Sequence, residues 1–309
     1  MFFYNSKTIG VVKKKYYFYK VYTLTYLINF LTTSIMKRIL VPTDFSEHAE
    51  YALKVAAQIA RKNNSEIILL HMLELPHQGG DALGSGHQIP EIMFYKEMAI
   101  KNLEELMDVD YLEGLNVSEI IQFEKAFDGI IKIVKKNDVD MIVMGSHGTS
   151  GFQEMLIGSN TEKVVRFSEV PVLVIKNNVG EFKASNFVFA SDFSQEIKAP
   201  FKQLTEFARI FDSKLSLVMI NTPNSFKPTH VAERIMSDFI KEFNYPNYSM
   251  HIYNDTNVEK GILNFSNSVN ADLIGMCTHG RTGFAHFFNG SISEDLVNHA
   301  VRPVITFKI

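Results

Sequence analysis

One pattern, present twice in this chain, restricts the folds open to it. In its first copy an apolar run at residues 141–144 ends in Gly145-Ser146-His147-Gly148, and nine residues separate this stretch from Gly158-Ser159. A short continuous apolar run is typical of a strand buried on both faces, as in a parallel sheet. Glycine has no Cβ, so Gly145 and Gly148 can take positive φ and let backbone N–H groups approach a ligand. We interpret residues 141–159 as a strand, a phosphate-binding loop and a helix start.

The residues after Gly158 predict that this helix begins at an anion site. Ser159 is a favourable N-cap residue, and Glu162, three positions later, can complete a capping box. The N–H groups of a first helical turn and the positive end of the helix dipole favour a bound anion. Turn glycines followed by an ordinary capped helix would give the same local sequence, so one copy alone leaves both interpretations open.

The second copy favours the binding interpretation. A second apolar run at residues 273–276 leads through Cys277 and Thr278-His279 to Gly280, and again nine residues separate Gly280 from Gly290-Ser291. Two loops with the same spacing in one chain argue against coincidence. The strand-like run before Asp44 also has a counterpart, which ends at Asp192.

The pattern G-x2-G-x9-G-[S/T] after a hydrophobic strand resembles the nucleotide-binding signature of the universal stress proteins, over residues 37–309 as two tandem copies. The resemblance implies an α/β fold of two tandem Rossmann-like domains, each with a five-stranded, mainly parallel sheet flanked by helices. It also implies ATP or a related adenine nucleotide as ligand, with or without Mg²⁺, and a dimer-like pairing of domains. We expect an extension at residues 1–35, a first domain at 36–177 and a second at 185–309.

The resemblance also implies the binding residues, which are carried over position by position. In the first copy these are Pro42, Thr43, Asp44, Met144, Gly145, Ser146, His147, Gly148, Gly158, Ser159 and Asn160. In the second copy they are Asp192, Gly280, Gly290 and Ser291. We expect this second site to be weaker, because Cys277 replaces the glycine at the position of Gly145. If positive φ or a close backbone approach is needed there, a side chain costs about 1–2 kcal/mol.

Asp44 has two interpretations. It follows a strand, at the side where open α/β sheets bind ligands, and the family resemblance implies a place beside the adenine and ribose. From spacing alone, Asp44 or Ser46 can instead cap the helix predicted at residues 49–61.

We predict neither a catalytic nor a metal centre. No nucleophile–base pair is recognisable around His147 or His279, and both the loop G-x-x-x-x-G-K-[S/T] and the adenylyl-transfer motif H-x-G-H are missing from the sequence. Three histidines, His71, His77 and His87, lack the short fixed spacing of a known metal site. They lie in or beside a long loop predicted at residues 74–97, which we interpret as a lid over the nucleotide.

Three functions therefore compete. In the first, the chain is a stress-response protein whose nucleotide occupancy sets its conformation or its partners. In the second it is a slow ATP-dependent hydrolase or transferase, and in the third an interaction module whose two sites are degenerate.

Strand and helix patterns alternate through both copies, which favours right-handed βαβ units. We expect strands near residues 38–41, 66–72, 118–123, 187–190 and 250–253, and helices near 98–107, 127–136 and 231–243. The closing strands at 172–175 and 304–307 are apolar, and an exposed apolar edge is a liability unless it is paired. We expect these two strands to pair within the chain as an internal pseudo-dimer, with a homodimer as a further possibility.

Composition narrows the remaining choices. With 309 residues, 46% hydrophobic and 21% charged, the chain suits two domains with full cores. A net charge of −3 without a Lys/Arg stripe argues against nucleic-acid binding. The single cysteine, Cys277, excludes an internal disulfide and suits the reducing cytoplasm, as either a buried hydrophobe or a redox-sensitive thiol.

Residues 1–35 differ from the rest, being dominated by Phe, Tyr, Asn, Lys and Ile. One interpretation is a start placed too far upstream, because Met36-Lys37-Arg38 leads directly into a strand. The other is a signal or membrane anchor. The apolar stretch at residues 21–35 is interrupted by threonines and an asparagine, and it falls short of the about 20 apolar residues of a membrane span. We expect no membrane association for the rest of the chain.

Overall fold

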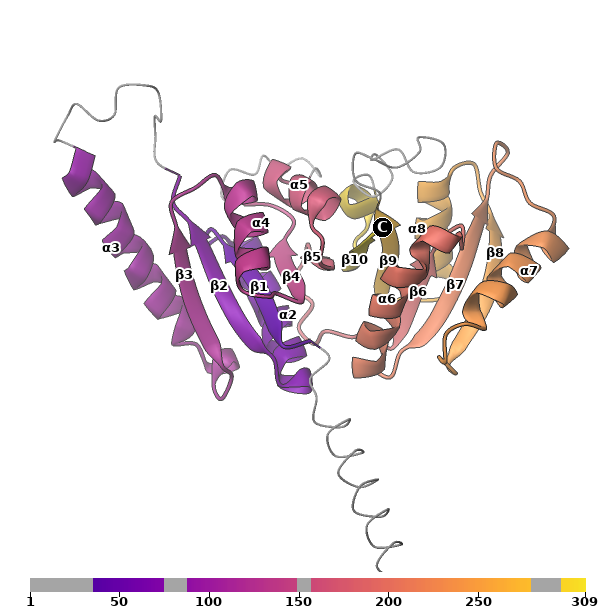
Figure 1. The fold of residues 1–309 in the computed structure, drawn as a ribbon, viewed down its shortest axis with the longest axis horizontal. Coiled ribbons are helices and arrows are strands. Elements are labelled where there is room, and N and C mark those ends of the chain that lie inside the picture. The colour runs from indigo at the N-terminus through magenta and orange to yellow at the C-terminus, as the bar shows by residue number, and fades with distance from the viewer. Residues whose placement is uncertain (1–35, 75–87, 149–156, 279–295) are drawn as a thin grey trace, which may run out of the picture. The chain divides into compact units, whose positions relative to one another are not determined.

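The computed structural model describes residues 36–74, 88–148, 157–278 and 296–309, which belong to one compact unit, Met36–Ile309. Their strands form one sheet in the order β3-β2-β1-β4-β5-β10-β9-β6-β7-β8 (Figure 1). The strands are β1 (Arg38–Thr43), β2 (Glu66–Met72), β3 (Val117–Gln122), β4 (Met141–Gly145), β5 (Val172–Ile175), β6 (Asn186–Ala190), β7 (Lys214–Asn221), β8 (Tyr248–Asn254), β9 (Leu273–Thr278) and β10 (Val304–Lys308).

Helices connect most of these strands and cover both faces of the sheet. They are α2 (Glu47–Asn63), α3 (Gln88–Met107), α4 (Ala126–Lys136), α5 (Ser159–Phe167), α6 (Lys198–Ile210), α7 (Thr229–Ile240) and α8 (Val258–Ser268), with 3₁₀ helices η1 (Asp110–Leu112) and η2 (Gln195–Ile197). We call β1–β5 with their helices the first repeat and β6–β10 with theirs the second repeat. All strand pairs inside each repeat are parallel.

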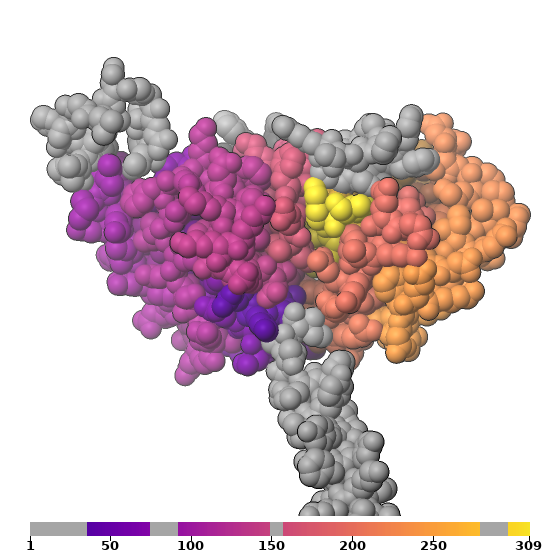
Figure 2. All heavy atoms as spheres, in the orientation of Figure 1, coloured from indigo at the N-terminus to yellow at the C-terminus, as the bar shows by residue number. Residues whose placement is uncertain are grey.

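The two repeats meet at the predicted closing strands. β5 and β10 pair antiparallel, with Val304 opposite Val174 and Thr306 opposite Val172. In Figure 2 the C-terminal residues, coloured yellow, lie at the junction between the two repeats. The predicted pairing within one chain is therefore confirmed, and it removes two apolar edges from solvent.

Two apolar layers form the core, one on each face of the sheet. Alternate strand residues point to opposite faces, so Ile39 and Val41 pack with α2 in one layer while Leu40 packs with α4 and α5 in the other. Both layers contain residues of the two repeats, and the first includes several phenylalanines of the second repeat, among them Phe189 and Phe201.

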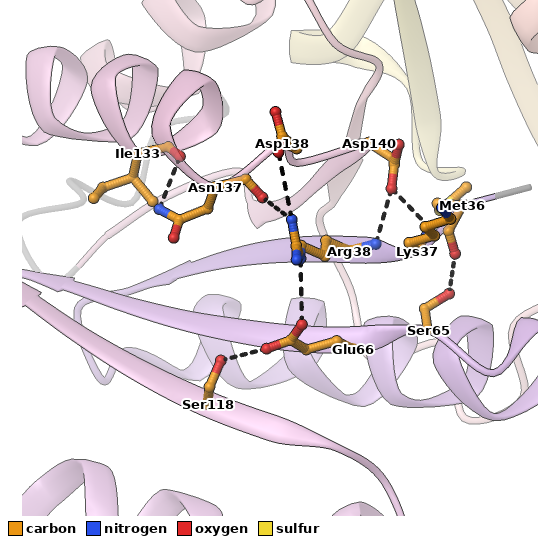
Figure 3. Close-up of polar contacts among 10 residues, drawn as sticks. All are labelled: Met36, Lys37, Arg38, Ser65, Glu66, Ser118, Ile133, Asn137, Asp138 and Asp140. Atoms are coloured by element: carbon orange, nitrogen blue, oxygen red, sulfur yellow. Dashed lines mark hydrogen bonds and ion pairs between the residues drawn. The ribbon is translucent and has the colours of Figure 1, made fainter. Parts of the chain in front are cut away.

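An aspartate fixes the start of each repeat. Asp140 Oδ2 accepts hydrogen bonds from Lys37 N at 2.7 Å and Arg38 N at 2.9 Å, and the Arg38 side chain reaches Glu66 at 3.4 Å (Figure 3). In the second repeat Asp272 accepts from Asn186 N at 2.8 Å in the corresponding place. These contacts tie the first strand of each repeat, β1 or β6, to its neighbour β4 or β9.

The predicted loop at residues 74–97 is wrong in its second part, because α3 already begins at Gln88. Pro90 falls in the first turn of that helix, where a missing N–H breaks no helical hydrogen bond. The rest of the loop, 75–87, lies outside the described residues, as do residues 1–35. In the part of the chain that the structure covers, no helix is long and apolar enough to cross a membrane.

Candidate functional site

The turn between β1 and α2 presents Asp44 in a fixed position. Phe45 adopts a left-handed conformation with φ of 63°, and its N–H donates to Thr43 Oγ1 at 3.1 Å. The next N–H, from Ser46, donates to Asp44 Oδ1 at 3.1 Å. The N-cap of α2 is Ser46, which accepts from Ala49 N at 3.3 Å, so the cap role considered for Asp44 belongs to Ser46.

Two glycines at the end of β4 are required by close packing. A Cβ on Gly145 would lie 2.7 Å from the backbone C and O of His48, and a Cβ on Gly148 would lie 2.4 Å from Asp44 Oδ2. Neither glycine has positive φ, so that part of the prediction is wrong. The missing side chain of Gly148 instead lets the Asp44 carboxylate lie directly against the loop.

The start of α5 differs from the predicted capping box. Gly158 is the N-cap, with φ of −62° and ψ of 144°, and its N–H donates to Ser146 O at 2.7 Å. Ser159 is the first helical residue, and within the described part of the chain no side chain caps this helix. The prediction of Ser159 as N-cap with Glu162 completing a box is therefore wrong by one residue. The first-turn N–H groups remain available to an external acceptor.

These elements meet in one open cleft of about 290 Å³ at the carboxyl ends of the strands. Ten of the eleven residues predicted for the first copy line it, and Ser146 is the exception, being 0% exposed. The cleft also contains residues that the sequence did not indicate: Ala49, Leu70, Met72, Glu74, Ala126, Ile130 and Thr161.

Four of the additional residues, Leu70, Met72, Ala126 and Ile130, form an apolar wall of the cleft. Met72 packs across the start of α4 at Gly129, where a Cβ would lie 2.0 Å from Met72 Cε. Ala126 and Ile130 continue the wall along the same helix. The small residues Ala126 and Gly129 were the signal that the sequence offered for this wall.

The charge of the cleft comes from carboxylates and backbone groups. Among its described lining residues there is no lysine or arginine, while Asp44 and Glu74 are acidic. Glu74 Oε1 accepts from Ala126 N at 2.8 Å and thereby caps α4. A bound anion would therefore be stabilised by the N–H groups and dipole of α5.

Ser146 and His147 are adjacent and in contact, with Ser146 Oγ 2.8 Å from His147 Nδ1. This resembles a nucleophile–base pair in distance only, because Ser146 is fully buried and its oxygen cannot reach a substrate. The His147 ring lies 5.2 Å from that of His48, whose Nδ1 is 3.0 Å from Lys176 O.

His71 has a local structural role. Its Nδ1 is 2.9 Å from Thr43 O, and its ring packs on Phe45 with centroids 4.5 Å apart. His77 and His87 lie outside the described residues, and the residues that the structure describes contain no cluster of three His, Cys, Asp or Glu side chains.

The second repeat has the same turn after its first strand, but its cleft is smaller. Phe193 has φ of 59°, and Ser194 N donates to Asp192 Oδ1 at 3.1 Å, as in the first repeat. The cleft beside Asp192 measures about 80 Å³, and Val258 stands where the first repeat has Ala126. Lys227, from the segment after β7, also lines it. Gly280, Gly290 and Ser291 lie outside the described residues.

Cys277 occupies the position of Gly145 without the expected backbone strain. It is 6% exposed, packs in the core, and is not among the described residues with positive φ. The helix after β6 also begins differently from α2: η2 takes the place of its first turn, and α6 starts only at Lys198. Burial raises the pKa of the Cys277 thiol, which favours the buried-hydrophobe interpretation.

Comparison with known proteins gives one consistent result. The sequence model described as "Universal stress protein family" matches residues 36–176 and 246–308. Universal stress protein MJ0577 of Methanocaldococcus jannaschii is 37% identical over 159 residues, which cover 45% of this chain and 94% of that protein. Universal stress protein Slr1230 of Synechocystis is 22% identical over 299 residues, which cover 88% and 100%.

Among solved structures, a universal stress protein from Archaeoglobus fulgidus superposes with a TM-score of 0.69 at 24% identity, over 88% of this chain and 98% of that one. This likeness supports the tandem α/β fold. The two segments matched by the family span more than half of the chain, which therefore belongs to the universal stress protein family.

Proposed function

We propose that the cleft of the first repeat binds an adenine nucleotide, ATP, and that its occupancy regulates the protein in a stress response. One observation carries the proposal. Residues from β1, from the β4 loop and from the start of α5, predicted from sequence as binding residues, line a single cleft with an uncapped helix N-terminus. A phosphate group is the ligand that such a terminus favours.

The cleft has separate parts for the two ends of a nucleotide. The phosphates would lie along Gly145–Gly148 and at Ser159 and Asn160. Ser146 N already donates to Ile175 O, so the N–H groups at the start of α5 would be the main donors to the phosphates. The apolar wall of Leu70, Met72 and Ile130 suits a flat heterocycle, and the Asp44 carboxylate suits ribose hydroxyls. Because the described lining has no basic side chain, Mg²⁺ bound with the phosphates would supply the missing positive charge.

The proposal is for regulation and not for turnover. Ser146, the serine next to His147, is buried, so this Ser–His pair cannot act on a ligand at the phosphate end. We infer a cytoplasmic protein that meets the nucleotide in solution, and a second repeat that binds nucleotide weakly or not at all because its cleft is smaller. Because β5 and β10 pair with each other, any homodimer would use another surface.

Calorimetric titration of ATP into the full chain tests the proposal, with Asp44→Asn and Asp192→Asn as a matched pair. Each substitution keeps the Oδ1 acceptor of its turn and removes only the charge. We expect about one nucleotide per chain and a 10- to 100-fold loss of affinity in Asp44→Asn, since hydrogen bonds to charged groups contribute about 1.5–3 kcal/mol.

Asp192→Asn should bind like the wild type. Absence of binding to the wild type would contradict the proposal, as would loss of binding in Asp192→Asn alone. Rapid phosphate release during the titration would contradict the regulatory role and favour an ATP-hydrolysing enzyme.

A further inference from the structure

The second repeat reaches into the loop that leads to α5 of the first. Asn298 lies in a helical turn at residues 296–299, and its Oδ1 accepts a hydrogen bond from Ile157 N at 2.6 Å. Ile157 immediately precedes Gly158, the N-cap of α5, and is 8% exposed. A side chain that lies 141 residues away in sequence therefore holds the backbone next to the candidate phosphate site.

Two further contacts connect the repeats in a reciprocal way. Lys176, which follows β5, donates to Asn298 O, and Lys308, at the end of β10, donates to Arg166 O at 3.2 Å. Counted from Ser159 and Ser291, Arg166 and Asn298 occupy the same position in the two repeats. Each lysine thus binds a carbonyl of the helical segment in the opposite repeat, where a cation is favourable near a helix C-terminus.

Asn298 makes an additional contact through its side chain. Its backbone is held by Lys176 while its side chain holds Ile157, so it joins three segments of the chain. In the first repeat, the backbone carbonyl oxygen of Arg166 accepts a hydrogen bond from the Lys308 side chain in the same manner. Besides the lysine contact that both repeats have, Asn298 therefore makes a side-chain contact with Ile157, next to the first cleft.

We propose that Asn298 is a positioning residue for the first cleft, through which the second repeat fixes the chain entering α5. The inference rests on nucleotide binding in that cleft. Two consecutive N–H groups are anchored on separate partners, Ile157 N on Asn298 and Gly158 N on Ser146 O. Together these bonds set the direction in which the following N–H groups of α5 point.

Loss of the Asn298 acceptor leaves the Ile157 N–H without its partner in a nearly buried place. The chain can restore a hydrogen bond only by moving this N–H towards water, and Gly158 would move with it. The apparent dissociation constant rises in inverse proportion to the fraction of molecules with the loop in place. A fall of that fraction to between one fifth and one twentieth weakens binding about 5- to 20-fold.

The test compares three full-length variants. Asn298→Leu removes the acceptor at similar volume, and Asn298→Asp keeps an oxygen for Ile157 N. Asn177→Leu is the matched control, because it removes another hydrogen bond between the repeats, from Asn177 Nδ2 to Val301 O at 3.2 Å, away from the loop. Two quantities are measured on each: ATP affinity by calorimetry, and hydrogen exchange of the Ile157 amide without nucleotide.

We expect Asn298→Leu to bind ATP about 5- to 20-fold more weakly, with faster exchange at Ile157. Asn298→Asp should restore both towards the wild type, and Asn177→Leu should leave both unchanged. Equal affinity in Asn298→Leu and the wild type would overturn the positioning role while leaving the proposed function intact. A wild type that binds no ATP would overturn both. An affinity loss in Asn177→Leu equal to that in Asn298→Leu would indicate general loosening of the repeats and also overturn the positioning role.

Discussion

Replacing Gly145 by alanine should destabilise the protein, whereas the same change at Gly158 should not. A Cβ at Gly145 would lie 2.7 Å from the carbonyl carbon and oxygen of His48, in the first turn of α2. Carbon atoms in proteins are in favourable contact at about 3.5–4.0 Å. Since the obstacle is helix backbone and not a flexible side chain, α2 or β4 must shift by close to one ångström.

The size of the effect follows from the two environments. Adding a methyl group to a packed core typically costs about 1–3 kcal/mol. At Gly158 the nearest atom to a new Cβ is Ser146 O at 3.5 Å, an ordinary contact, and φ is −62°. Alanine fits there and restricts the unfolded chain, which stabilises by about 0.4–1 kcal/mol. The two variants should therefore differ by about 1.4–4 kcal/mol in the free energy of unfolding.

Thermal unfolding without nucleotide provides the assay. About 1 kcal/mol shifts Tm by about 2–4 °C in proteins of 150–250 residues, so Tm of Gly145→Ala should be at least about 3 °C below that of Gly158→Ala. Equal Tm values, or the reverse order, would refute the steric role assigned to Gly145. The result does not depend on ligand, so it tests the packing of β4 against α2 separately from nucleotide binding.

Three further predictions concern other parts of the fold. Burial lowers the pKa of Lys176 from 10.5 to about 8, so the unfolded state binds more protons than the folded state between these pH values. The wild type should therefore gain stability relative to Lys176→Met as pH rises through this window. Urea unfolding at pH 7.5 and 9.5 measures the stability difference between the two proteins, and a difference independent of pH would contradict the prediction. Asp140→Ala should lower the free energy of unfolding by about 1–2 kcal/mol, more than Asp272→Ala, because Asp140 accepts hydrogen bonds from two backbone N–H groups at the start of β1. Urea unfolding compares the two variants, and an equal loss of stability would argue against the role of the second hydrogen bond. The Cys277 thiol is buried and its pKa is raised, so it should react with a thiol reagent only at urea concentrations that unfold the protein. Reaction of the thiol in the native state would contradict its packing in the core.

The strands could be predicted from sequence because buried parallel strands are written as short apolar runs. The strand expected at residues 66–72 is β2, Glu66–Met72. The pairing of β5 with β10 was expected from the apolar character of both strands, whereas its antiparallel direction was not. The first half of helix α3 was not predicted, because residues 93–98 are all exposed and none of them packs in the core. A helix segment without a buried face shows no apolar periodicity.

The sequence indicated part of the cleft lining but not its contacts. Ten residues implied by the family resemblance line the cleft, yet Gly145 is required by the backbone of His48 and Gly148 by the carboxylate of Asp44. Both neighbours are about a hundred residues away in sequence, and no local pattern reports such a distance. For the same reason Asn298 carried no sequence signal, since its contact with Ile157 exists only when the two repeats pair.

The comparison of the two repeats separates what the aspartates do for the fold from what they can do for a ligand. Asp44 and Asp192 each accept the N–H of the serine two residues later, at 3.1 Å, beside a left-handed phenylalanine. That bond is present in a wide cleft and in a narrow one, so it belongs to the turn and gives no indication of binding. The second oxygen of Asp44 lies against Gly148, at the wall of the wide cleft. We therefore expect ligand binding to depend on the charge at that oxygen, which Asp44→Asn removes while the turn is preserved.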